Sequence, residues 1–174
     1  MRIIGVDPGL VNTGVGIIET DASPKIARIS GSGEFQFLQT SILKPPTGDL
    51  SRRLLFLHQN LLDLIRQWRA EVMAVEDQFY GNNVQTAFKT GQARGAALLA
   101  AAQAGIPVEL YPPARVKMAL VGNGRASKEQ VQHMVRQILA TNSIPPSLDC
   151  SDALAVALCH AFSNSAAARI GAQR

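Results

Sequence analysis

Residues 2–9 read Arg-Ile-Ile-Gly-Val-Asp-Pro-Gly, and this stretch decides the fold. Its first six residues favour a short β-strand, and Asp7-Pro8-Gly9 is a turn signal. A second strand is predicted over residues 14–19 and a third within residues 25–37, followed by a loop over residues 38–49. Because the connections are short and rich in turn residues, we expect these three strands to form an antiparallel meander.

Helices and strands alternate in the rest of the chain. The apolar spacing predicts helices over residues 49–69, 83–105, 114–120, 128–140 and 149–162, and strands over residues 71–77 and 107–111. The order predicts an α/β fold with a mixed five-stranded sheet, three strands antiparallel and two parallel, flanked by helices. We expect residues 1–165 to form a single domain and residues 166–174 to form a flexible C-terminal tail.

Positive charge is concentrated in one part of the chain. The net charge is +4 and the pI is about 9.4. Residues 85–137 carry seven basic and two acidic residues, a net +5, and the basic ones are Lys89, Arg94, Arg115, Lys117, Arg125, Lys128 and Arg136. This asymmetry is typical of proteins with a polyanionic partner, although an ordinary solvated basic surface would give the same pattern.

The sequence shows no targeting or membrane signal. No apolar run approaches the roughly 20 residues that span a bilayer. Asp7 interrupts the N-terminal apolar run too early for a signal peptide. Cys150 and Cys159 are nine positions apart in one predicted helix and therefore on opposite faces, where they cannot form a disulfide with each other. We therefore expect a cytoplasmic protein that does not associate with membranes.

Four acidic residues are predicted to meet at one edge of the sheet. Asp7 and Glu76 each end a predicted strand, and parallel neighbouring strands would place both carboxylates at the same edge. Asp149 and Asp152 are three residues apart and share one face of the last helix. Mutual repulsion, on the order of 4 kcal/mol per close pair, would be relieved by hard divalent cations. Two such ions can hydrolyse a phosphodiester.

Each acid also has an ordinary structural explanation. Asp7 before Pro8-Gly9 could simply shape a turn. Asp149 could cap the last helix, and Asp152 suits the positive end of the helix dipole. Glu76 is the hardest to explain in this way, because an ionised acid at the end of an apolar strand needs a partner.

Five segments in order resemble the RuvC family of bacterial Holliday junction resolvases. They are residues 4–9 with Thr13-Gly14, residues 75–76, residues 91–95, residues 130–135 and residues 149–155. The likeness extends over essentially the whole chain. It implies a ribonuclease H-like fold and a metal-dependent endonuclease that resolves four-way junctions in homologous recombination and DNA repair.

The resemblance also implies roles for individual residues. Asp7, Glu76, Asp149 and Asp152 would be the catalytic carboxylates, binding two Mg²⁺ or Mn²⁺ ions per active site. Hydrolysis would leave a 5′-phosphate and a 3′-hydroxyl. The enzyme would be a homodimer that makes paired symmetric nicks, with the RuvA–RuvB branch-migration complex as partner. The DNA contacts would come from basic residues near the scissile phosphate and from a loop aromatic: Arg115, Lys117, Lys128, and Phe79 or its neighbour Tyr80.

Three other functions remain open at this point. A ribonuclease H or transposase-like nuclease would act on hybrids or linear duplex. The first hairpin, with Asp7-Pro8-Gly9 followed by Thr13-Gly14, is also similar to the phosphate loop of actin-like ATPases and sugar kinases, which need two such domains. A DNA-binding module without activity would hold the acids for structure alone.

Overall fold

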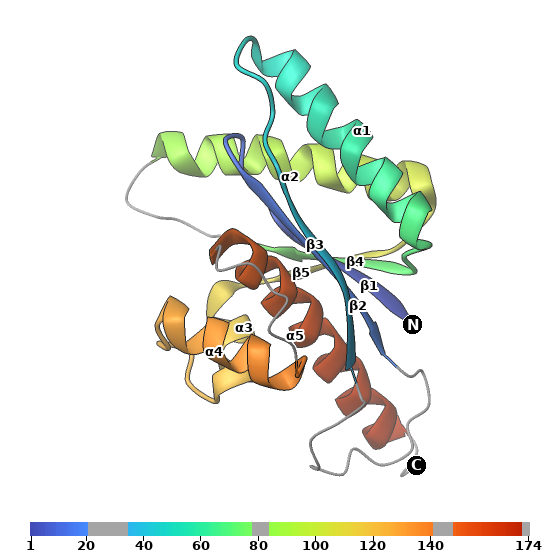
Figure 1. The fold of residues 1–174 in the computed structure, drawn as a ribbon, viewed down its shortest axis with the longest axis vertical. Coiled ribbons are helices and arrows are strands. Elements are labelled where there is room, and N and C mark those ends of the chain that lie inside the picture. The colour runs from blue at the N-terminus through green and yellow to red at the C-terminus, as the bar shows by residue number, and fades with distance from the viewer. Residues whose placement is uncertain (21–34, 78–83, 141–147, 172–174) are drawn as a thin grey trace.

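The computed structural model describes residues 1–20, 35–77, 84–140 and 148–171, with side chains described up to residue 164. Figure 1 shows the elements of this part of the chain. The strands are β1 (Arg2–Asp7), β2 (Thr13–Thr20), β3 (Phe35–Leu43), β4 (Val72–Glu76) and β5 (Val108–Tyr111). The helices are α1 (Leu50–Trp68), α2 (Val84–Ala104), α3 (Pro113–Val121), α4 (Lys128–Ile138) and α5 (Leu148–Gly171).

The strands form one mixed sheet in the order β3-β2-β1-β4-β5. The pairs β1–β2 and β2–β3 are antiparallel, and the pairs β1–β4 and β4–β5 are parallel. The predicted five-stranded sheet is therefore confirmed. Since Val6 is the register partner of Val75, the next residues, Asp7 and Glu76, leave the sheet side by side.

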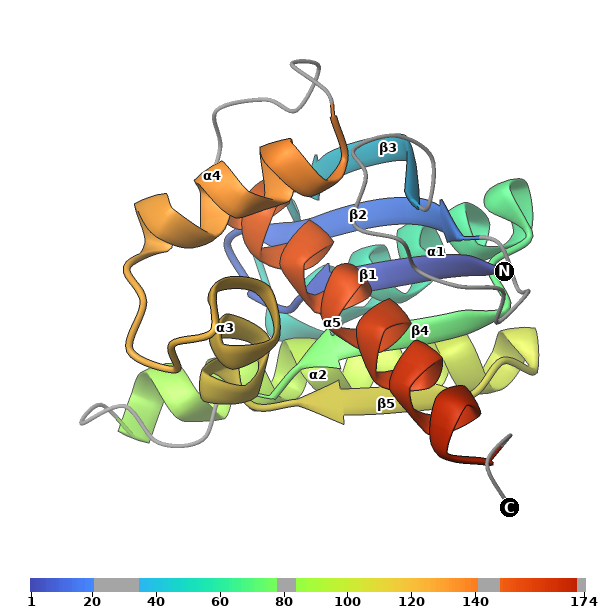
Figure 2. The ribbon, with the colours of Figure 1, turned by 90° about the horizontal axis from the view of Figure 1, so that it is seen from below.

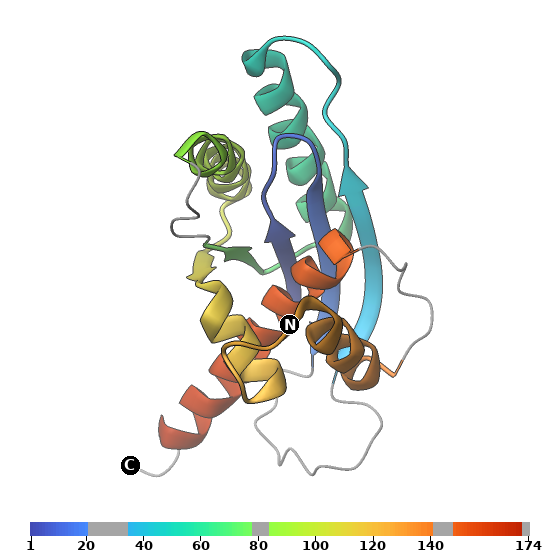
Figure 3. The same cartoon turned by 90° about the vertical axis from the view of Figure 1, so that its left-hand side faces the viewer.

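Helices cover both faces of the sheet (Figures 1 and 3). On one face, α1 and α2 pack over a core that includes Met73 and Val75 of β4. On the other face, α5 lies across the sheet, with α3 and α4 packed outside it, over a core that includes Val72 and Ala74. Successive side chains of β4 therefore point to opposite helical layers, as the strand geometry requires.

Helix α5 approaches β1 and β2 so closely that only glycine fits below it. A Cβ atom on Gly5 would overlap the carbonyl oxygen of Ala153, and one on Gly14 would overlap the carbonyl oxygen of Asp149. A Cβ atom on Gly16 would lie 2.7 Å from the side chain of Leu154. The three glycines therefore set the height and the lengthwise position of α5 on the sheet.

The third strand differs from its prediction. We expected it within residues 25–37 with a loop over residues 38–49, whereas β3 runs from Phe35 to Leu43. Residues 25–34 lie outside the described residues. The position of β3 is set by its partner, since Thr20 pairs with Phe35 and Thr13 with Leu43 along the whole of β2. An edge strand can carry polar residues such as Gln36, Gln39, Thr40 and Ser41, so the apolar alternation that marks a strand is weak here.

Helix boundaries agree with the sequence signals except at the last helix. Asp49 caps α1, and Ser127 with Gln130 forms the predicted capping box of α4. The predicted end of the last helix at residue 162 is wrong, because α5 continues to Gly171 through the strong helix formers at positions 166–168. Most of the predicted tail is thus helical. The domain limits themselves stay a prediction.

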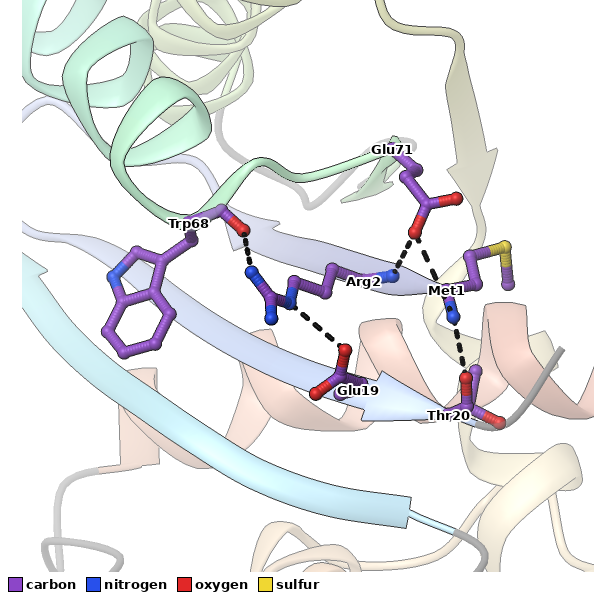
Figure 4. Close-up of polar contacts among 6 residues, drawn as sticks. All are labelled: Met1, Arg2, Glu19, Thr20, Trp68 and Glu71. Atoms are coloured by element: carbon purple, nitrogen blue, oxygen red, sulfur yellow. Dashed lines mark hydrogen bonds and ion pairs between the residues drawn. The ribbon is translucent and has the colours of Figure 1, made fainter.

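The amino-terminal end of β1 is anchored by several polar groups (Figure 4). The Met1 ammonium donates to the Thr20 carbonyl at 2.7 Å. The Arg2 guanidinium pairs with Glu19 at 3.1 Å and donates to the Trp68 carbonyl at the end of α1. These bonds fix the end of the strand opposite to Asp7.

No helix in the described part of the chain is long and apolar enough to cross a membrane.

Substitution of Gly5 by Ala tests the packing of α5. The added methyl group meets backbone rather than a movable side chain, so we expect a loss of about 3 kcal/mol of unfolding free energy, the upper end for overpacked cores. Gly91→Ala, compared with Gly5→Ala at a protein concentration that keeps both monomeric, is the control, because within one chain its methyl group would meet nothing within 4 Å and should stabilise α2 by about 0.5–1 kcal/mol. Equal denaturation midpoints for the two variants would contradict this account.

Candidate active site

The first two predicted acids lie next to each other at the carboxyl edge of the sheet. Asp7 is the last residue of β1 and Glu76 the last residue of β4, and the two strands are parallel neighbours. Ala74 belongs to the core beneath α5, so alternation along β4 also points Glu76 toward that helix. The two carboxyl groups share a hydrogen bond. Glu76 is buried and Asp7 half-buried.

Asp152 completes the group from the other side. It lies in the second turn of α5. The start of α5 is at the same end of the molecule as the carboxyl ends of β1 and β4 (Figure 2). Its carboxylate accepts a hydrogen bond from Lys128 Nζ at 2.9 Å, with Lys128 at the start of α4. Three acids from three elements, with one cation beside them, therefore meet at this edge.

Burial and repulsion change the protonation of this group. The pKa of Asp7 is raised from 3.8 to about 8, chiefly by burial and further by the charges of Glu76 and Asp152, while Lys128 opposes the rise. The hydrogen bond to Asp152 raises the pKa of the Lys128 ammonium. Crowded carboxylates at a strand edge are unfavourable for folding, and such perturbed groups are concentrated at functional sites.

A cavity of about 130 Å³ opens beside these acids. Glu76 and Asp152 line it together with Lys117 of α3 and Lys128 of α4. Its remaining walls are the apolar parts of Pro113, Val116, Val131 and Ala155. Two carboxylates and two ammonium groups line one cavity. The carboxylates can bind a divalent cation and the ammonium groups can bind a phosphate, so the cavity can hold both together.

The acids fit a divalent metal by their chemistry. Carboxylate oxygens are the ligands of Mg²⁺ and Mn²⁺, and a cation would remove the repulsion that raises the pKa of Asp7. In the described part of the chain, no three acidic, histidine or cysteine side chains are already arranged as a closed set of metal ligands. Asp152 pairs with Lys128, so a bound ion would share this carboxylate with the lysine.

Asp149 is not among the charged residues that act on Asp7 in the described part of the chain. It is half-buried in the first turn of α5, one turn before Asp152, and its carbonyl packs over Gly14 of β2. The charges that shift the pKa of Asp7 come from Glu76, Asp152 and Lys128. The structure therefore brings together three of the four predicted carboxylates, with Asp149 on the adjacent turn.

The predicted DNA-contacting residues divide into three groups. Lys117 and Lys128 line the cavity. The Arg115 guanidinium instead stacks 5.0 Å from the centre of the Tyr111 ring and donates to Ser163 of α5. Phe79 and Tyr80 lie outside the described residues.

Sequence reasoning missed one pair of residues at this edge. Neither residue is among the site residues predicted from the sequence, where Arg94 belongs only to the basic segment and to the family-like residues 91–95. The structure joins them in an ion pair between the end of β4 and helix α2. Strand alternation was the available signal, because it points Asp77 away from Glu76 and toward the layer that contains α2.

Sequence comparison gives consistent matches over nearly the whole chain. The model of the family described as "Crossover junction endodeoxyribonuclease RuvC" matches residues 3–160. The protein of that name from Chloroflexus aurantiacus is 43% identical over 172 residues, which cover 98% of this chain and 99% of the relative.

Solved structures give the same result. "Thermus thermophilus RuvC structure" has a TM-score of 0.82 and 37% identity, covering 98% of this chain and 97% of the other. "T. thermophilus RuvC in complex with Holliday junction substrate" has a TM-score of 0.84 and 36% identity, with 96% of each chain covered. The similarity therefore includes the sheet, the helices and the edge where the acids meet.

The raised pKa of Asp7 predicts how stability depends on pH. The folded chain keeps a proton that the unfolded chain releases above about pH 4, so in metal-free buffer the free energy of unfolding should fall as pH rises from about 4 to about 8. Asp7→Asn removes this contribution. Denaturant titrations across this range should show wild type losing stability relative to Asp7→Asn. A constant difference, or a gain by wild type, would rule out the burial effect.

Proposed function

The chain belongs to the RuvC family of crossover junction endodeoxyribonucleases, and on that basis we propose that it resolves four-way DNA junctions by paired symmetric nicks. The ribonuclease H-like fold expected from the sequence is confirmed by the likeness to the Thermus structures. The observation that supports the proposal most directly is the meeting of Asp7, Glu76 and Asp152 beside a cavity that also holds Lys117 and Lys128.

In the proposed reaction, the acids would hold two Mg²⁺ or Mn²⁺ ions. Asp7, Glu76 and Asp152 would be the principal ligands, and Asp149 on the adjacent turn would be the fourth. Bound ions of this kind activate water and stabilise the leaving oxygen in phosphodiester hydrolysis, which would leave a 5′-phosphate and a 3′-hydroxyl. The buried edge supplies fixed carboxylates, so the ligands are in place before the DNA arrives.

The two lysines of the cavity would position the scissile phosphate. Lys117 and Lys128 come from different helices, and both line the cavity that contains Glu76 and Asp152. Lys128 also neutralises Asp152, so its ammonium connects the acid cluster to the phosphate. For Arg115 we propose a less direct role, since its guanidinium is engaged with Tyr111 and Ser163. Phe79 or Tyr80 as the aromatic contact to junction bases stays a prediction.

We propose that helix α2 forms the interface of a homodimer. One face of α2 is used inside this chain, where Ala93, Ala96, Ala97, Ala100 and Ala101 are buried. The opposite face is largely open, with Val84, Phe88 and Leu99 at 82%, 68% and 62% exposure. Gly91, Gly95 and Ala102 share this open face at helical spacing, and no atom lies within 4 Å of a Cβ atom placed on either glycine. A two-fold partner would give the symmetric junction two equivalent sites.

Two further aspects follow from the proposed function alone. Resolution of junctions during homologous recombination and DNA repair would place the protein with the chromosome, in the cytoplasm of a bacterial cell. The RuvA–RuvB branch-migration complex as partner stays a prediction.

A charge on the open face of α2 tests the dimer. Leu99→Glu should produce monomers in sedimentation experiments, because a two-fold interface would bury one unpaired carboxylate from each protomer. Such monomers should nick junctions in one strand at a time. Leu55→Glu on α1, at a similarly exposed position, is the control and should leave assembly unchanged. A Leu99→Glu protein that stays dimeric would contradict this choice of interface.

Removal of one acid tests the reaction. Glu76→Gln keeps the shape of the side chain and removes its charge, so the variant should bind a synthetic four-way junction yet cut it slower by orders of magnitude in Mg²⁺. Glu71→Gln, at the opposite end of β4, is the control and should cut normally. Linear duplex should be a poor substrate for both. Wild-type cutting by Glu76→Gln would refute the site, and equal cutting of linear duplex would refute junction selectivity.

A further inference from the structure

The residue after Glu76 is held by groups from two other elements. Asp77 is buried, and its side chain is only 8% exposed. Its backbone N–H donates to the carbonyl of Tyr111, the last residue of β5, at 2.9 Å. Its carboxylate accepts a hydrogen bond from Arg94 Nη1 of α2. The peptide that follows the predicted metal ligand is thus fixed both within the sheet and against a helix.

Side-chain alternation at the end of β4 directs Glu76 and Asp77 to opposite faces of the sheet. Val75 packs in the core beneath α1 and α2, and Ala74 in the core beneath α5. Continued alternation points Glu76 toward Asp152 and α5, and Asp77 toward Arg94 and α2. The Asp77 carboxylate therefore does not join the crowded group at Asp7. Arg94 compensates its charge on the other side of the sheet.

We propose that Asp77 and Arg94 are positioning residues of the active site: their ion pair fixes the end of β4 against α2, and so holds the Glu76 carboxylate in place for metal binding. This proposal rests on the proposed metal-dependent function. Arg94 itself does not line the cavity, and it acts through the backbone between Asp77 and Glu76. Bonds that orient a ligand without touching the metal typically contribute about 10–100-fold to metal affinity or activity.

The location of Arg94 gives the pair a second consequence. Arg94 lies next to Gly95, which is on the open face of α2 where we place the dimer interface. Helix α2 therefore contributes Gly95 to the proposed dimer interface and the neighbouring Arg94 to the ion pair at the end of β4. A partner that immobilises α2 would also immobilise the anchor of Glu76, in both protomers alike.

Direct measurement of metal binding tests the proposal. Titration calorimetry of the full chain with Mn²⁺ alone should show about 10–100-fold weaker binding for Asp77→Asn and for Arg94→Gln than for wild type. Junction affinity in Ca²⁺ should change little, so any loss of nicking in Mg²⁺ should lie in kcat rather than in KM. Glu19→Gln is the matched control, because it breaks another Arg–carboxylate pair of the same sheet at its opposite end (Figure 4).

A double variant separates positioning from simple stabilisation. Breaking a buried ion pair leaves an uncompensated charge, so the single variants should also melt at lower temperature. Asp77→Leu with Arg94→Met replaces the pair by apolar groups and should recover much of the melting temperature. If the pair positions Glu76, Mn²⁺ binding should stay weakened in the double variant; if Mn²⁺ binding recovers together with the melting temperature, the pair is only structural and the proposal is wrong.

The outcomes also distinguish this proposal from the function on which it rests. If wild type bound no Mn²⁺, or if Glu76→Gln bound it as well as wild type, the metal site itself would be wrong and this inference would fall with it. If wild type binds Mn²⁺ through Glu76 while Asp77→Asn and Arg94→Gln bind it equally well, only the positioning role fails.

Discussion

The close approach of α5 to the sheet is the constraint on which the rest of the structure depends. Gly5, Gly14 and Gly16 leave no room for side chains where the helix crosses β1 and β2. The contact fixes the helix along its own axis as well as its height, because each glycine faces a different residue of α5. Asp152 therefore reaches the edge where β1 and β4 end, and a shift of one helical residue, about 1.5 Å with a turn of about 100°, would direct it elsewhere.

Much of the fold could be predicted from the sequence because local patterns and packing agree. The apolar run of β4, the capped helices and the turn after Asp7 each have signals within a few residues. One error occurs where a long-range partner determines the structure. The position of β3 follows from pairing with β2, which no pattern within its polar sequence reveals. The other error is local, because the high helix propensity of the alanines at positions 166–168 continues α5 beyond residue 162.

For the site, the sequence predicted the three acids that meet, together with Asp149, which lies one turn away, but not how their charges are balanced. Asp7 and Glu76 follow from the parallel arrangement of two strands, and Asp152 from helical spacing. The partners of these charges come from residues distant in sequence, such as Lys128 for Asp152 and Arg94 for Asp77. Arg115 shows the same limit, because the sequence did not indicate that its guanidinium packs on the Tyr111 ring. Composition indicates the sign of the charge on a surface, whereas the fold determines which residue each charged side chain pairs with.

The balance of charge at this edge explains why so many ionic groups are tolerated there. Burial makes a charged Asp7 unfavourable, and Glu76 and Asp152 increase the cost, so the acids need positive charge from outside their own elements. Lys128 supplies part of it, and it is exposed enough to meet a phosphate at the same time. Divalent ions would supply the remainder. Arg94 neutralises Asp77 on the face of the sheet that α2 covers, so Asp77 adds no uncompensated charge to the acid group. Without ligands, the negative charge of the acids at this edge is only partly compensated. With metal and phosphate both bound, the charges would compensate one another, and this is the state in which cleavage would occur.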